Sequence, residues 1–157
     1  MNRHDLEIIV NHIASQGLLA ISQNTDEKDL LINYMGIFAK DDTEFMEMDD
    51  IVKTLGTPGD NTATASGSTY LLNEPFNTPA GPLKVLKIRR PDPTRPQRGA
   101  PDFRVKDYSS FKEKYLSSTG NFSLMIRKDY EMLELKGVDV LVYFPSKTFD
   151  ERQLISS

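Results

Sequence analysis

The sequence KIRRPDPTRPQRGAPDFRV, residues 87–105, separates two parts of the chain that each contain strand-like hydrophobic patterns. It carries six Lys or Arg residues and four prolines in nineteen positions. Proline has no backbone N–H, so it is largely excluded from the central strands of a sheet. We therefore expect residues 91–98 to form a stiff, extended crossing between two structural units.

The part that follows the crossing is predicted to form a β-α-β-β-β unit. Apolar and polar residues alternate over 102–105, as in a half-buried strand. Asp107 can then cap a helix whose apolar side chains recur at helical spacing over 108–115. Three further strands are expected over 122–127, 130–135 and 140–144.

The part before the crossing is predicted to contain a similar, less regular series. It begins with a helix whose apolar stripe ends at Gly17. A short strand is expected over 18–21, followed by helices over 25–38 and 42–56. After a loop at 57–68, two strands are expected over 69–72 and 83–88, with a turn at 73–82 between them.

Together these elements predict a single α+β domain of 157 residues. Its expected parts are an N-terminal helix (1–17), a first, irregular module (18–90), the crossing (91–98) and a second βαβββ module (99–157). Two such modules packed side by side would form one curved, mixed, mainly antiparallel sheet that encloses a cleft.

The composition is that of an ordinary globular protein. Hydrophobic residues make up 38% of the chain and charged residues 27%, which does not fit a disordered protein. No stretch approaches the ~20 apolar residues that cross a bilayer, and Asp5 and Glu7 interrupt the N-terminal stretch, unlike a signal peptide. The absence of cysteine excludes disulfides and Cys-type zinc sites. We expect a cytoplasmic protein with no membrane partner.

The net charge of −4 is unevenly distributed. Residues 1–60 carry twelve acids and four bases, whereas residues 84–106 carry eight bases and two acids. This asymmetry indicates either an anionic partner or attraction between the two regions, within one domain or across a homodimer. Nucleic acid is not expected, because no aromatic residue that could stack on a base lies between Lys84 and Phe103.

The tandem of β-α-β-β-β units resembles the vicinal oxygen chelate superfamily, which includes glyoxalase I, extradiol dioxygenases and bleomycin-resistance proteins. Within it, the chain looks most like the YecM-like branch. Three stretches carry the resemblance: STYLLNEPF (68–76), LKVLKIRRPDPTRPQRGAPDFRV (83–105) and ELKGVDVLVYFPSKTFDERQL (134–154). They look like a strand and turn, the crossing between modules, and a final hairpin with a closing short helix.

The resemblance implies where a metal would bind. Active members hold a divalent metal with His, Glu or Gln on the first and last strands of each module. In this sequence those positions fall near Leu18, at Asp102, and at Val142 or Tyr143, so Asp102 is the only candidate metal ligand. His4 and His12 lie eight residues apart on the first predicted helix, too far apart for a common ion. No cofactor is therefore predicted.

These observations lead to one function hypothesis with two alternatives. The first is a small-molecule-binding protein of glyoxalase-like fold that lacks a complete catalytic metal site. Its ligand is expected to be anionic or polar, and its expected contacts are Asp102, Arg104, Arg89, Tyr70 and Tyr143. The alternatives are a metal-dependent lyase, isomerase or dioxygenase that uses Asp102, and a protein-interaction module that uses the acidic helical half. Whether the protein is an enzyme stays open at this level.

Overall fold

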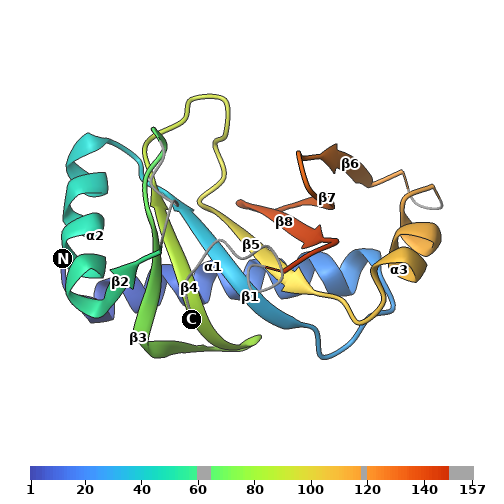
Figure 1. Ribbon diagram of the computed structural model, residues 1–157, viewed down its shortest axis with the longest axis horizontal. Coiled ribbons are helices and arrows are strands. Elements are labelled where there is room, and N and C mark those ends of the chain that lie inside the picture. The colour runs from blue at the N-terminus through green and yellow to red at the C-terminus, as the bar shows by residue number, and fades with distance from the viewer. Residues whose placement is uncertain (60–64, 118–119, 149–157) are drawn as a thin grey trace.

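The computed structural model describes residues 1–59, 65–117 and 120–148, and it contains two βαβββ modules joined edge to edge (Figure 1). The first helix, α1 (Arg3–Asn24), precedes both modules. The first module contains β1 (Leu31–Phe38), α2 (Asp42–Leu55), β2 (Gly56–Pro58), β3 (Thr69–Thr78) and β4 (Gly81–Arg89). The second contains β5 (Gly99–Arg104), α3 (Tyr108–Tyr115), β6 (Phe122–Ile126), β7 (Glu131–Gly137) and β8 (Val140–Pro145). The predicted α+β class is thus confirmed.

The strands of both modules form one sheet in the order β2-β3-β4-β1-β5-β8-β7-β6. Within each module the first strand pairs in parallel with the last, β1 with β4 and β5 with β8. The other pairings are antiparallel, including the central pair β1–β5 that joins the modules. From the central β1–β5 pair to either edge of the sheet, the strands follow the same order: first, last, third and second strand of the module. Because the central pair is antiparallel, an approximate two-fold axis near it relates the two modules.

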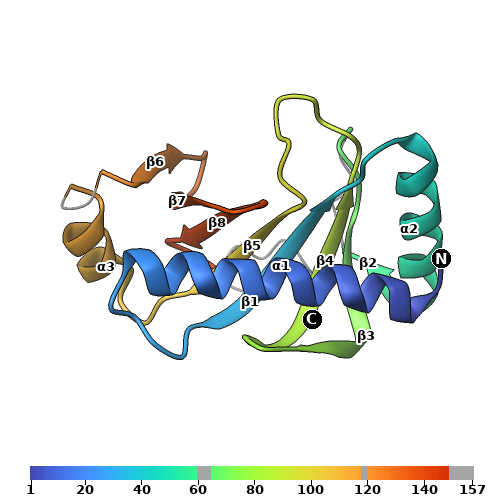
Figure 2. The same cartoon turned by 180° about the vertical axis from the view of Figure 1, so that it is seen from behind.

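Helix α1 lies along one face of the sheet and contacts strands of both modules (Figure 2). Its buried face includes Leu6, Val10 and Ile13, which belong to the same core cluster as residues of α2, α3 and the sheet. Burial of each such side chain contributes about 1.5–3 kcal/mol. We call this side of the sheet the covered face and the opposite side the far face.

Two of the predicted elements are wrong. Residues 18–21, expected to form a strand, lie in α1, which continues past Gly17 to Asn24. Gly17 does not end the helix but lets it approach the sheet, because a Cβ there would lie 3.0 Å from the Phe103 ring. Residues 31–38, expected to be helical, form the central strand β1. The first module therefore begins at Leu31 and not at residue 18.

The remaining predicted helices and strands within the described residues are confirmed, with changes in their bounds, but residues 57 and 58, expected in a loop, belong to β2. The expected turn at 73–82 is shorter, because β3 extends to Thr78 and β4 begins at Gly81. Asp107 caps α3 as predicted, since its side chain accepts a hydrogen bond from the Ser110 amide. The expected closing helix near residue 154 lies outside the described residues, as does part of the loop at 57–68. None of the helices in the described ranges is long and apolar enough to span a bilayer.

Candidate functional site

The centre of the far face is a shallow floor made by the paired residues Gly36 and Ala100. A Cβ added to Gly36 would lie 3.5 Å from Arg89 Cδ and 3.5 Å from the Tyr34 hydroxyl oxygen. Both side chains therefore extend over the space that the missing Cβ leaves. Both contacts are at ordinary van der Waals distance, so Arg89 and Tyr34 cover Gly36 without being displaced by it.

Arg89 on the far face combines a stacked guanidinium group with a buried nitrogen atom that has no hydrogen-bond partner among the described residues. Its guanidinium carbon lies 4.8 Å from the centroid of the Phe38 ring, in a cation–π arrangement. Its Nε atom is buried and has no hydrogen-bond partner among the described residues. Lys87 lies two residues earlier on the same strand face, and burial together with the charge of Arg89 lowers the pKa of that lysine. This part of the far face therefore concentrates positive charge.

Tyr143 connects the far face to the crossing segment. Its hydroxyl group donates to Glu134 Oε2 at 2.9 Å and accepts a hydrogen bond from Arg95 Nη1 at 3.2 Å. Burial and the bond to Glu134 raise the pKa of Tyr143 to about 12, so the phenol stays protonated at neutral pH. Its hydroxyl group therefore acts as a neutral link that holds the Arg95 guanidinium in place.

Apolar side chains surround these polar groups. Phe38, Ala100, Met132, Leu141 and Tyr143 form a small buried cluster that is separate from the main core, and Met125 and Tyr130 pack against it. The far face thus has two kinds of surface. The β4 side carries positive charge, and the β7–β8 side carries apolar side chains.

The structure brings together three of the five residues expected to contact a ligand. Arg89, Asp102 and Tyr143 lie on the far face, and Asp102 is paired in register with both Tyr34 and Tyr143. Arg104 lies on the same face of β5 but is exposed. Tyr70 does not join this group. It lies in the main core on the covered face, where burial and nearby Asp49 of α2 raise the pKa of Tyr70 to about 12.

The positions that the resemblance reserves for metal ligands do not form a donor set. Asp102 is six residues before the start of α3, and the equivalent residue six before α2 is Gly36, not Leu18 as expected from the sequence. Val142 points into the main core. Over residues 1–59, 65–117 and 120–148 there is no group of three or more His, Cys, Asp or Glu side chains that could hold a metal ion. The residues in these ranges therefore do not fit the metal chemistry of the superfamily.

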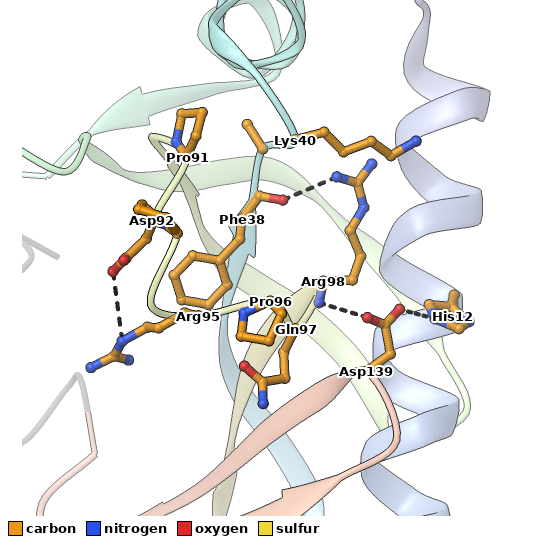
Figure 3. A pocket seen from close by; sticks show the side chains of 12 residues that line it. His12, Phe38, Lys40, Pro91, Asp92, Arg95, Pro96, Gln97, Arg98 and Asp139 are labelled. Carbon is orange, nitrogen blue, oxygen red and sulfur yellow. Dashed lines mark hydrogen bonds and ion pairs between the residues drawn. The ribbon is translucent and has the colours of Figure 1, made fainter.

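A cavity of about 620 Å³ lies beneath the crossing segment (Figure 3). In Figure 3, Asp92 and Arg95 lie on one side of Phe38, and Lys40, Arg98 and Asp139 lie on the other. The remaining lining residues are His12, Ala39, Pro91, Pro93, Pro96 and Gln97. Phe38 belongs both to this lining and to the far-face cluster, so the cavity adjoins the Arg89 region.

Several cavity residues already have partners within the protein. Arg98 forms a bidentate ion pair with Glu44 and also donates to the Phe38 carbonyl oxygen at 3.0 Å. Asp139 Oδ2 lies 2.9 Å from His12 Nε2, and its Oδ1 accepts from the Arg98 amide at 3.0 Å. The pKa of Asp92 is lowered, mainly by hydrogen bonds from Thr94, with smaller contributions from Arg95 and Arg89. Both arginines thus act on the same carboxylate at the edge of the cavity.

Sequence reasoning missed most of the cavity. Arg95 was counted within the basic segment, but its contact with Tyr143 depends on a fold in which residues 48 positions apart meet. Phe38 falls within the helix predicted over 25–38, and no sequence pattern indicates Lys40, so neither is a candidate from the sequence. The one available signal is the proline-rich, basic composition of residues 91–98, which contribute more than half of the lining residues.

Comparison with solved structures supports the fold. A chain described as "Structural Genomics, Protein EC4020" has a TM-score of 0.67 and 11% sequence identity, and the similarity covers 94% of this chain and 91% of that chain. At this identity the likeness concerns the fold alone, since one fold can carry many functions. No protein-family model matches the sequence, and no curated protein matches it. Fold and site together define the class: an α+β protein of tandem βαβββ modules with a positively charged, partly apolar far face.

Proposed function

We propose that this protein binds a small anionic ligand at Arg89 and Arg95, next to the cavity, without a bound metal. The buried Nε atom of Arg89, which has no partner among the described residues, carries this proposal. An unsatisfied buried donor costs about 1–3 kcal/mol. A carboxylate that accepts hydrogen bonds from one edge of the guanidinium group would remove this cost.

The surroundings favour an anion over a neutral ligand. Arg89 lies beside Lys87, whose lowered pKa reflects burial and repulsion between the two positive charges. Arg95 is held by the Tyr143 hydroxyl group, and its Nε lies 3.8 Å from Asp92, a weak ion pair that leaves the guanidinium group able to bind another oxyanion. The apolar cluster next to Tyr143 offers a surface for the uncharged part of a ligand.

The tandem βαβββ architecture supports the resemblance to the vicinal oxygen chelate superfamily. We propose that the protein is a glyoxalase-like member that binds a ligand without a metal. Ligand binding is favoured over metal-dependent catalysis because Asp102 would lack a partner ligand in the first module. The equivalent position there is Gly36, which has no side chain that could bind a metal. A cytoplasmic location belongs to the same proposal and rests on the cysteine-free sequence.

The test is a titration of the protein with acetate and, separately, with inorganic phosphate. Binding is monitored through changes in the backbone amide signals in NMR spectra. We expect shifts at Arg89, Arg95 and Tyr143, and a loss of affinity of about tenfold or more in Arg89→Gln, the effect of one charge-assisted hydrogen bond. Arg127→Gln is the matched control, because the Arg127 side chain is exposed and donates to the carbonyl oxygen of its neighbour Ile126. Equal binding by Arg89→Gln and the wild type would overturn the proposal.

A further inference from the structure

The two edges of the sheet differ in how well they are protected against pairing with another strand. At one edge lies β2, which has three residues and ends at Pro58, a residue that cannot donate a backbone hydrogen bond. At the other edge lies β6, whose five residues, FSLMI, include neither a proline nor a charged residue. Proline, charge and a very short strand are the usual features that prevent edge pairing. The β6 edge is therefore the less protected of the two.

Hydrogen bonds at the β6–β7 turn show which backbone groups of β6 face β7. The Arg127 amide donates to the Tyr130 carbonyl oxygen at 2.9 Å, so these two opposite residues form a hydrogen-bonded pair. The next opposite residues are Ile126 and Glu131, and the Glu131 backbone exchanges hydrogen bonds with Ser146 on its other side. The Ile126 carbonyl oxygen instead accepts a long hydrogen bond, 3.3 Å, from the Arg127 side chain. Hydrogen-bonded and non-hydrogen-bonded pairs thus alternate along this antiparallel ladder.

The same alternation gives the direction of the remaining backbone groups of β6. Those of Ser123 and Met125 face β7, whereas the N–H and C=O groups of Phe122, Leu124 and Ile126 point away from the sheet. No strand within residues 1–59, 65–117 and 120–148 pairs with this outer edge, and β6 lies at one end of the sheet in Figures 1 and 2. The edge thus offers a row of backbone donors and acceptors to a further strand.

The side chains beside these backbone groups are apolar on the covered face. Phe122 is buried against the Phe111 and Tyr115 rings of α3, with ring centroids 6.0 and 5.7 Å apart. Leu124 and Ile126 follow on the same face of the strand and are 38% and 66% exposed. A strand that paired with the outer edge of β6 would cover both of these aliphatic side chains.

We propose that β6 is a dimerisation edge, at which β6 of a second copy of this chain pairs in antiparallel orientation about a two-fold axis at Leu124. In this register Leu124 lies opposite Leu124 of the second copy, and Phe122 lies opposite its Ile126. All three are residues whose backbone groups point outward, so each exchanges hydrogen bonds with the other copy. Apolar side chains then face apolar side chains along the whole covered face of the junction. This dimer does not depend on the proposed anion site.

The neighbouring residues favour a second copy in this register. Just outside the strand, Asn121 would lie opposite Arg127 of the second copy, so no like charges are placed opposite each other. A register centred on Ile126 would instead set Leu124 opposite the charged Lys128. The contact is isologous, because the same edge of both copies is used, and association therefore stops at the dimer.

Sedimentation velocity of the full chain over a range of concentrations tests the dimer. Only five residues of each copy pair, so we expect a small interface with a Kd on the order of 10 µM to 1 mM. Raising the salt concentration should not dissociate the dimer, because its contacts are apolar side chains and backbone hydrogen bonds. A dimer held by attraction between the acidic and basic regions of two copies would dissociate in high salt.

A pair of charge variants tests the two-fold register. Leu124→Lys and Leu124→Glu each place like charges opposite each other and remove an apolar contact, so each alone should weaken dimerisation about tenfold or more. An equimolar mixture of the two variants should form heterodimers, because an ammonium group then faces a carboxylate. Met46→Lys is the matched control, because Met46 is an aliphatic residue that is 63% exposed on α2, and this variant should dimerise like the wild type.

Hydrogen exchange of single amides provides a second measurement. The amides of Leu124 and Ile126 should exchange more slowly at high protein concentration than at low concentration, because only the dimer gives them partners. The amides of Ser123 and Met125 already face β7 and serve as the internal control, with little dependence on concentration.

Each of the other outcomes would overturn the proposal. A wild type that stays monomeric at 1 mM, or that dissociates in high salt, shows that β6 does not form this dimer. Dimerisation of Leu124→Lys at the wild-type affinity shows that another surface is used. Failure of the mixed Lys and Glu variants to associate, although the wild type dimerises, shows that Leu124 does not face its counterpart. Growth into larger assemblies shows that the contact is not isologous.

Discussion

Arg98 and Glu44 form a bidentate ion pair that joins the crossing segment to the start of α2, with Nη1–Oε1 and Nη2–Oε2 distances of 2.6 and 3.0 Å. Both side chains are largely buried, at 13% and 15% exposure. Glu44 belongs to the acidic first part of the chain and Arg98 to the basic segment. Attraction between the two oppositely charged regions therefore occurs within one chain, at least at this contact.

Removal of one partner of this pair should destabilise the protein. Arg98→Met would leave the Glu44 carboxylate largely buried and would remove the hydrogen bond to the Phe38 carbonyl oxygen. We expect the free energy of unfolding, measured by urea denaturation, to fall by about 2 kcal/mol. As a control, Lys53→Met removes an exposed ammonium group from its pair with Asp49 and should change stability by less than about 1 kcal/mol. Similar losses in the two variants would contradict this prediction.

The same pair predicts a pH dependence. The hydrogen bond from Arg98 lowers the pKa of Glu44 below its usual 4.5, against the smaller opposing effect of burial. A carboxylate whose folded-state pKa is depressed stabilises the fold above its unfolded-state pKa, and this contribution disappears as the pH falls through the folded-state value. The wild type should therefore lose more stability than Glu44→Gln when the pH is lowered below about 4.5. Urea denaturation of both proteins at pH 7, 5 and 4 measures the difference, and parallel curves would refute it.

Two glycines in the central strand pair provide a test of how closely α1 approaches the sheet. A Cβ on Gly99 would lie 2.8 Å from Ile13 Cγ1 of α1, whereas a Cβ on Gly36, on the far face, would meet its nearest atoms at 3.5 Å. Gly99→Ala should lower the free energy of unfolding by about 1–3 kcal/mol through overpacking. Gly36→Ala should be neutral or stabilising by up to about 1 kcal/mol, because alanine has less conformational freedom in the unfolded chain. Equal effects in thermal denaturation would show that α1 does not press on β5.

Metal removal tests the enzyme alternative. Stable metal sites need several converging donors, and Asp102 has no second donor at the equivalent position in the first module. We expect elemental analysis of the purified protein to find no stoichiometric Mn, Fe, Ni or Zn, and EDTA to leave the Tm unchanged. Asp102→Asn should have the same metal content as the wild type. A stoichiometric metal that is lost in this variant would favour the metal-dependent lyase, isomerase or dioxygenase.

The second module was predictable because its signals are local. Asp107 caps α3 through the next three residues, and the strands after it are short segments with clear breaks between them. Alternation along β5 also placed Asp102 and Arg104 on one face without knowledge of the partners of the strand. In these elements the residues that determine the structure lie within a few positions of one another.

The first module was harder to predict because its central strand does not look like a strand. Residues on both faces of β1 are buried, Met35 and Ile37 against the helices and Phe38 on the far face. Burial on both sides removes the alternation that identifies a strand, and the remaining apolar spacing imitates a helix. In α1, Gly17 looks like a helix end in the sequence. A glycine is needed there because the helix packs closely against Phe103, a residue far along the chain that local sequence patterns do not reveal.

The sequence by itself determined the α+β class, the β-α-β-β-β order of the second module, and the concentration of positive charge in the proline-rich crossing before it. These properties depend on composition and on periodicity, which act over short distances. Only the tertiary structure decided that Tyr70 faces the helices while Tyr143 faces Arg95, and that Lys40, Arg95 and Gln97 line one cavity. Those relationships depend on strand register and on which strands become neighbours, and both are set by the packing of the whole core.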